Sequence, residues 1–141
     1  MIKTYNEIIQ EFINDTLFLQ NYTKTENMLN QNYDARLTVK IGKRIEKNLQ
    51  AILCADEGIA LFKELLVNEN FYIRFIAARY LYPIIPQEAI TIMREYKNSL
   101  SDNVKKYEVE NVIKGLESKQ SVFMAQFKKL YGVNFEKYAC I

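Results

Sequence analysis

Histidine and tryptophan are absent from the 141-residue sequence, and proline, cysteine and glycine are scarce, with two, two and four copies. Without histidine, the side chain that most often shuttles protons near neutral pH is missing, and Ser-His-Asp and Cys-His catalysis is excluded. The two cysteines, Cys54 and Cys140, form no C-x-x-C pair, so they indicate neither a disulfide framework nor a zinc site. We expect one buried thiol and one tail thiol, no metal, no cofactor and no enzymatic activity.

A long apolar run is also missing at the start of the chain. Lys3, Glu7, Glu11 and Asp15 interrupt the segment in which a signal peptide or membrane span would need continuous apolar residues. The sequence therefore predicts a cytoplasmic protein with no membrane association.

Composition is that of one soluble globular domain over residues 1–141, with 49% hydrophobic and 26% charged residues. The 19 basic and 17 acidic side chains nearly balance, whereas a nucleic-acid-binding domain is usually clearly basic. The charges are nevertheless uneven, because residues 1–34 hold two basic and five acidic side chains and residues 35–55 hold five basic and one acidic. We expect an acidic segment followed by a basic one.

Apolar residues recur at three- and four-residue spacing, which predicts an all-α fold of about seven helices. Capping boxes at Thr4 with Glu7 and at Thr23 with Glu26 predict where the first two helices begin. Gly132 stands where a left-handed helix C-cap is expected. The predicted helices are 4–18, 24–53, one from Asp56 to the turn at 68–70, one from Asn70 to about Tyr82, one from Pro86, one from Ser101 through Leu116, and 119–131.

An internal repeat lies within residues 56–117. A shift of 31 positions places the third and fourth predicted helices on the fifth and sixth. The matched pairs are Ile59 with Ile90, Phe62 with Met93, Leu65 with Tyr96, Ile73-Arg74 with Val104-Lys105, Ala78 with Val109, and Leu81 with Val112. Such repeats bury their apolar faces by stacking and leave an extended surface for binding, so we expect two stacked helical hairpins of an α-solenoid.

Residues 61–81, LFKELLVNENFYIRFIAARYL, resemble a HEAT repeat through the isoleucine-arginine pair followed by two alanines. Residues 83–89, PIIPQEA, resemble a bacterial family of short HEAT-like domains of uncharacterised function. Proteins of that kind occur among the immunity proteins of bacterial toxin systems, including contact-dependent growth inhibition. The resemblance covers residues 5–115, and residues 122–141 depart from it. It implies a HEAT-like α-solenoid and an immunity protein that binds one cognate toxin domain, a nuclease being one candidate, in a one-to-one complex.

Six residues are candidates for partner binding. Arg36, Lys40 and Lys43, together with Arg44 and Lys47, would line one face of the second helix and could grip phosphates or an acidic protein surface; a solvated face is the commoner alternative. On the fourth helix, three side chains are expected on an outer stripe if the alanines face inward, where aromatic and arginine residues favour an interface. Packing against the first two helices explains them equally well. These three candidates are Phe75, Arg79 and Tyr82.

Two other polar groups are expected to be structural. Arg74 should turn inward toward acceptors in a turn or a neighbouring helix. Glu7, Glu11 and Asp15 form a ladder on the first helix that we interpret as a solvated acidic face rather than a catalytic or metal site.

Other functions stay open at this point. A HEAT-like adaptor with a non-toxic partner and a nucleic-acid-binding protein are the alternatives, although the balanced charge argues against nucleic acid. HEAT-like DNA glycosylases are a minor alternative, since this chain is short and lacks tryptophan. The role of residues 119–141 is also open, because Phe127, Leu130 and Phe135 would serve equally to cap the core or to form a dimer surface.

Overall fold

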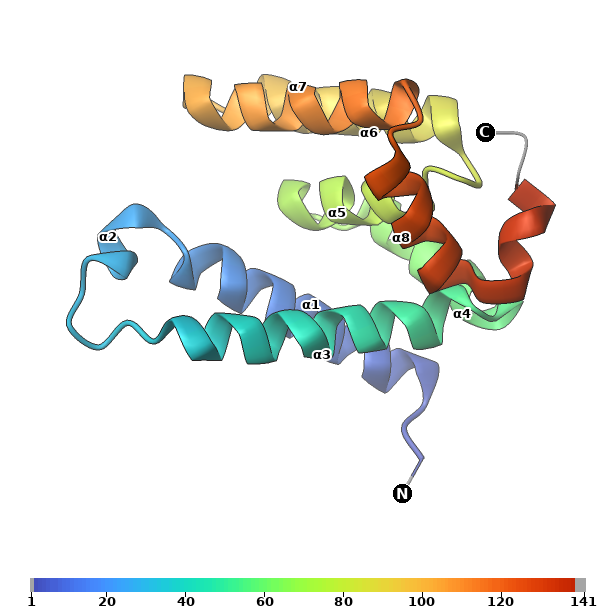
Figure 1. Cartoon of the computed structure of the whole chain (residues 1–141), viewed down its shortest axis with the longest axis horizontal. Helices are drawn as coiled ribbons and strands as arrows, with labels where there is room; N and C mark the ends of the chain where they lie inside the picture. Colours follow the sequence, from blue (N-terminus) through green and yellow to red (C-terminus); the bar gives the residue numbers. More distant parts are fainter. Residues whose placement is uncertain (1, 139–141) are drawn as a thin grey trace.

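A computed structural model describes residues 2–138, and this part of the chain is all-helical and contains no strand, which confirms the all-α class (Figure 1). Cys140 lies outside the described residues. Eight α-helices and two short 3₁₀ segments are present in residues 2–138, close to the expected number. They are α1 (Tyr5–Tyr22), α2 (Thr25–Met28), α3 (Ala35–Leu53), α4 (Asp56–Lys63), η1 (Glu64–Val67), α5 (Phe71–Leu81), α6 (Pro86–Ser99), α7 (Asn103–Glu117), α8 (Ser121–Tyr131) and η2 (Gly132–Tyr138).

The prediction of one helix over 24–53 is wrong. Thr23 ends α1, donating from its hydroxyl to the Leu19 carbonyl at 2.7 Å, and only the short α2 follows. The chain then turns, with the Asn32 amide donating to the Asn30 side chain at 2.8 Å. Asp34 caps α3 by accepting from the Arg36 amide. Asn and Asp side chains compete with helical hydrogen bonds in this way, so apolar periodicity alone did not reveal the break.

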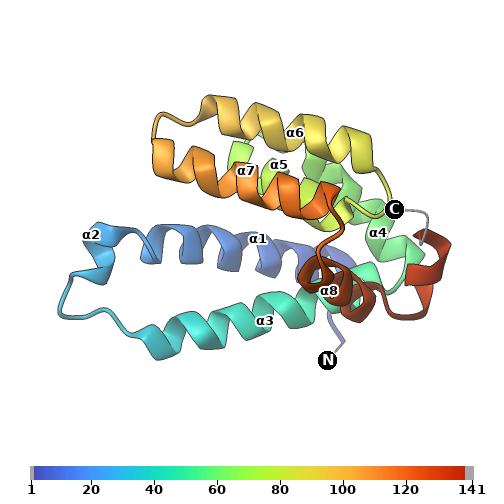
Figure 2. The same cartoon turned by 45° about the horizontal axis from the view of Figure 1, so that its top comes forward.

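The helices form two antiparallel pairs with α4 and α5 between them (Figures 1 and 2). In one pair α1 packs on α3, and in the other α6 packs on α7; α5 packs on α6 and more lightly on α1. The α2 end of the α1–α3 hairpin projects past the α6–α7 pair (Figure 1). We call the segment from Phe18 to Val39 the arm.

The last α-helix crosses back over the stack and packs on α3. Phe127, Leu130 and Tyr131 of α8 are at most 1% exposed, and the Tyr131 hydroxyl donates to the Tyr80 carbonyl at 2.6 Å. Gly132 is the C-cap of α8, as expected, but its φ of +57° and ψ of −132° lie outside the left-handed αL conformation that was expected; glycine adopts this positive-φ conformation readily because it has no Cβ. Since these apolar side chains are already covered, α8 caps the core.

The two hairpins that the 31-residue shift relates, α4 with α5 and α6 with α7, share a core but differ in the burial of their second helices. Phe62 and Met93, which the 31-residue shift pairs, are both fully buried. Ile73 is likewise buried, whereas its counterpart Val104 is 66% exposed. The difference arises because α5 lies between two helix pairs, while α7 has helices on one side only (Figure 1).

The connection from α3 to α4 is tight, and its glycine is required. A Cβ on Gly58 would lie 2.2 Å from the Ile52 carbonyl oxygen, closer than any side chain tolerates. Cys54, at the end of α3, is exposed, so the expectation of a buried thiol is wrong. It lies at the helix C-cap, where the chain turns outward before α4.

Candidate functional site

The arm holds aromatic side chains in order while leaving apolar surface uncovered. Tyr22 stacks on Phe18 with ring centroids 5.2 Å apart and on Tyr33 with centroids 5.0 Å apart. The Tyr22 hydroxyl accepts a 2.7 Å hydrogen bond from the Asp34 amide, which ties the two sides of the arm together. Phe18 is 42% exposed and Leu29 is 81% exposed. An ordered surface of this kind is typical of a binding site.

Four cations follow α3 on the side that faces away from the other helices. Their spacing of four, three and four residues keeps them on one face, while Ile41 faces the core. All four are exposed; Arg36 contacts Asp34 at 3.3 Å, and the lysines form no ion pair with a residue between 2 and 138. We call them the basic stripe: Arg36, Lys40, Lys43 and Lys47.

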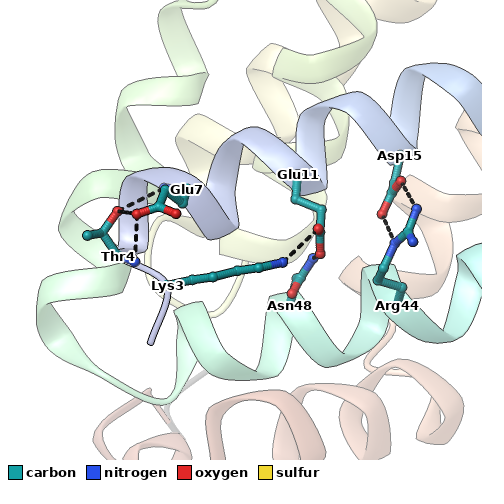
Figure 3. A network of polar contacts seen from close by, with 7 residues as sticks. All are labelled: Lys3, Thr4, Glu7, Glu11, Asp15, Arg44 and Asn48. Atoms are coloured by element: carbon teal, nitrogen blue, oxygen red, sulfur yellow. Dashed lines mark hydrogen bonds and ion pairs between the residues drawn. The ribbon is translucent and has the colours of Figure 1, made fainter. Parts of the chain in front are cut away.

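Arg44 does not belong to this stripe, because it pairs with α1 (Figure 3). Its Nε donates to one carboxylate oxygen of Asp15 at 2.7 Å and its Nη2 to the other at 2.6 Å. Asp15 is only 6% exposed, and the pairing raises the pKa of Arg44. Two-point contacts of this kind are the strongest ion pairs in proteins, so the pair fixes the position of α3 against α1.

The rest of the acidic ladder is also engaged. Glu11 accepts from the Asn48 side chain at 2.9 Å and from Lys3 at 2.8 Å, and these bonds lower its pKa (Figure 3). Glu7 completes the capping box with Thr4. The interpretation of a solvated acidic face is therefore wrong for Glu11 and Asp15, because α3 presents donors to these two carboxylates that a single helix does not reveal, while Glu7 is exposed as expected.

Phe75 and Tyr82 are buried, so their expected place on an outer stripe of α5 is wrong. Phe75 is 6% exposed and stacks on Tyr96 of α6 with ring centroids 4.7 Å apart. Tyr82 is 8% exposed and stacks on Phe127 of α8 at 6.4 Å. Helices on both sides of α5 cover the faces that periodicity assigned to solvent, and this leaves Arg79 as the partly exposed member of the three.

Arg79 lies in a cleft between the two helix pairs, on the α5 floor. The cleft has two lobes that share Gln20, Tyr72, Ile76 and Arg79. The lobe toward α3, which we call the α3 lobe, has a volume of about 370 Å³, and the lobe toward α7 about 260 Å³. Burial raises the pKa of Tyr72 to about 12, so its phenol is neutral and able to donate a hydrogen bond at physiological pH.

Two residues that line the α3 lobe each have a buried polar atom that lacks a partner within the described chain. The Arg79 Nε is buried without an acceptor, and its guanidinium lies over the rings of Tyr80 and Phe123 at 5.3 and 5.7 Å. Arg79 forms no ion pair with a carboxylate among residues 2–138. The Thr16 hydroxyl is also buried without a partner, in a residue that is 6% exposed. Sequence reasoning missed Thr16 and Gln20, since neither carries a motif.

Arg74 has the structural role expected of it. Its Nε donates to the Asn68 carbonyl in the turn before α5, and its guanidinium lies 4.5 Å from the centroid of the Phe71 ring. The contact fixes the turn that starts α5, together with the Asn70 cap, which accepts from two backbone amides.

Comparisons of the chain with protein-family models, curated proteins and solved structures found no match. The HEAT-like resemblance and the immunity family therefore stay predictions. Within residues 2–138, no three His, Cys, Asp or Glu side chains are grouped so as to hold a metal ion. None of the described helices combines the length and apolar character needed to cross a membrane.

Proposed function

We propose that this chain is a HEAT-like, non-enzymatic immunity protein that acts in the cytoplasm by binding one cognate toxin domain. The arm carries the proposal: it is ordered by stacking and hydrogen bonding, yet exposes Phe18 and Leu29 beside the basic stripe. Exposed aromatic and apolar anchors next to cations are what a protein interface uses. The expected partner surface is acidic, with an apolar depression that receives the arm.

The same arrangement suits inhibition by occupancy. An arm that projects from a packed body can enter a groove on a toxin domain and cover its active site or substrate path. A toxin that acts on nucleic acid has a cationic substrate groove, which would repel the basic stripe. The stripe instead needs a partner surface with acidic residues. We therefore place the arm against an acidic rim of the toxin rather than inside a phosphate-binding groove.

The test uses the gene encoded next to this one, expressed alone and together with this chain while cell growth is followed. We expect toxicity alone, rescue on co-expression, and a one-to-one complex on purification. A harmless neighbour that does not bind would overturn the proposal.

Variants then locate the interface. Lys40→Glu with Lys43→Glu should raise the Kd of the complex about tenfold or more and slow association, because the expected partner surface is acidic. Lys63→Glu with Lys128→Glu is the matched control, since these lysines are also exposed but lie on α4 and α8. Equal affinity of both double variants would contradict the placement of the interface on the basic stripe beside the arm.

The basic stripe also keeps nucleic-acid binding as a second candidate. Four cations at helical spacing can follow a phosphate backbone, and such binding weakens steeply with salt. RNA or DNA binding with a steep salt dependence, lost in the Lys40→Glu, Lys43→Glu variant, would favour that function over the immunity function.

A further inference from the structure

We propose that the α3 lobe of the cleft is a binding site for a small organic monocarboxylate with an apolar body. This inference goes beyond the proposed function and does not depend on it, because the lobe lies between the helix pairs and includes none of Phe18, Leu29 or the basic stripe, although Leu19, Gln20 and Thr23 of the arm line it. It rests on three features of the lobe, which are its lone cation, its unpartnered polar atoms and its apolar walls.

Among residues 2–138, Arg79 is the only charged side chain that lines the α3 lobe, and no carboxylate of this part of the chain lines it. Its Nε is buried and without an acceptor, a costly arrangement for a cation that is not paired. A guanidinium presents its donors in a planar fork that matches the two oxygens of a carboxylate. One carboxylate bound to the other guanidinium nitrogens would neutralise the single charge.

Thr16 also lines the lobe and has a second unpartnered polar atom, buried beside it. Its hydroxyl is buried, and it does not form the hydrogen bond to the preceding helical turn that threonine commonly makes. Gln20, one turn further along α1, lines the lobe as well. Two polar residues of α1 thus stand opposite Arg79 of α5, as expected of a lobe that orients a polar ligand.

The remaining walls favour an apolar body on that ligand. Leu19, Ile45 and Ile76 line the lobe together with the rings of Tyr72 and Tyr80. The volume of about 370 Å³ lies within the range of small-molecule sites. A single cation among apolar walls suits a monoanion such as a carboxylate better than a phosphate, which would need more positive charge.

Gly42 opens the lobe on the α3 side. A Cβ placed there meets no atom within 4 Å, so this glycine is not required by packing, and it lies in a helix where glycine is unfavourable. The space beside it therefore belongs to the lobe, and a larger side chain at this position would fill part of the lobe without changing its charge.

The test is binding of 3-phenylpropionate to the full chain, followed by calorimetry and by amide NMR shifts. We expect a Kd of about 1 mM or lower, with shifts confined to α1, α3 and α5 around the lobe. The neutral 3-phenylpropionamide should bind about 10- to 100-fold more weakly, because it cannot make charge-assisted bonds to Arg79. Inorganic phosphate should not bind. Equal affinity for acid and amide would overturn the proposal.

Two variants test separately the positive charge of Arg79 and the free volume beside Gly42. Arg79→Gln should weaken binding of 3-phenylpropionate by about the same factor as the change from acid to amide. Arg94→Gln, at an exposed position of α6, is its control. Gly42→Leu should abolish binding by filling the lobe while the fold is retained, and Ala125→Leu on the exposed face of α8 is its control. If Arg79→Gln fails to fold, Gly42→Leu still decides: unchanged affinity in that variant would refute the site.

Discussion

The two halves of the α1–α3 hairpin are ordered by different means. In the half near α4, Phe12 is fully buried and meets Phe62 edge to face, with ring centroids 5.4 Å apart. In the arm, Phe18 and Tyr33 stack on Tyr22 without a further layer over them, and Phe18 is 42% exposed. The near half is held by burial from all sides, and the arm by local stacking and capping.

The ion pair of Asp15 with Arg44 stands at the boundary between these halves, just before Phe18 on α1. It holds α3 in register where the apolar core thins out. The molecule can keep an exposed apolar arm ordered because ring stacking and polar contacts, rather than burial, fix its geometry. A surface prepared in this way loses little conformational entropy on binding.

Truncation in the near half should have the largest effect on stability. Phe62→Ala should lower the free energy of unfolding by about 3–5 kcal/mol, because it removes a fully buried ring and leaves a cavity. Leu29→Ala in the arm should change it by less than about 0.5 kcal/mol, since that side chain is 81% exposed. Urea unfolding followed by circular dichroism measures both. Similar losses in the two variants would mean that the arm contributes to the core.

Breaking the boundary ion pair should have an intermediate effect. Arg44→Ala leaves the carboxylate of Asp15 buried without its partner and should cost about 1–3 kcal/mol of unfolding free energy. Lys3→Ala, which removes a more exposed contact to Glu11, should cost less than about 1 kcal/mol. A double-mutant cycle of Asp15→Ala with Arg44→Ala isolates the pair, and a coupling energy near zero would contradict its role at the boundary.

Alkaline pH should affect the packed body before it affects the arm. Burial raises the pKa of Tyr72 from 10.0 to about 12, so the neutral phenol stabilises the fold fully below pH 10. That contribution is lost as the pH rises through 12. Burial also raises the pKa values of Tyr82, Tyr96 and Tyr131, which belong to the same body.

Absorbance of tyrosinate and circular dichroism, recorded together during the titration, check this expectation. The buried tyrosines should ionise only as the helical signal is lost above pH 10. If all ten tyrosines ionised near pH 10 with the helices intact, the burial of these phenols would be contradicted.

Disturbing the arm's own stack should have the smallest effect on the whole fold. Tyr33→Ala removes one stacked ring and should cost about 0.5–1.5 kcal/mol locally. Hydrogen exchange should accelerate in α2 and the first turn of α3 and stay unchanged in α5 and α6. Uniform acceleration across the chain would show that the arm and the body unfold as one unit.

Several features were predictable from local sequence because local physics decides them. Thr4 and Glu7 form the predicted capping box, Asn70 caps α5, and Gly132 stands at the predicted C-cap of α8 with a positive φ. The side-chain pattern within α3 also placed Arg36, Lys40 and Lys43 on a common exposed face. The break at residues 29–34 was missed, because Asn30 and Asp34 interrupt the helix through hydrogen bonds that apolar spacing does not register.

The residues of the candidate site also fall into those that the sequence could place and those that it could not. The cations of α3 could be recognised from the sequence, because exposure on one helix follows from spacing alone. The burial of Phe75 and Tyr82 could not be predicted, because the helices that cover them lie further along the chain. Phe75 is covered by α6, which begins 11 residues after it, and Tyr82 by α8, which begins 39 residues after it.

The helical class, the starts of most helices and the face of α3 that carries cations could all be predicted from the sequence, because each follows from residues a few positions apart. Three further features emerge only when the helices pack: Asp15 pairs with Arg44, α8 returns to α3, and the Arg79 Nε is buried with no acceptor among residues 2–138. Those outcomes depend on how helices distant in sequence pack together. Packing is fixed by the shape and burial of whole faces, which no local pattern encodes.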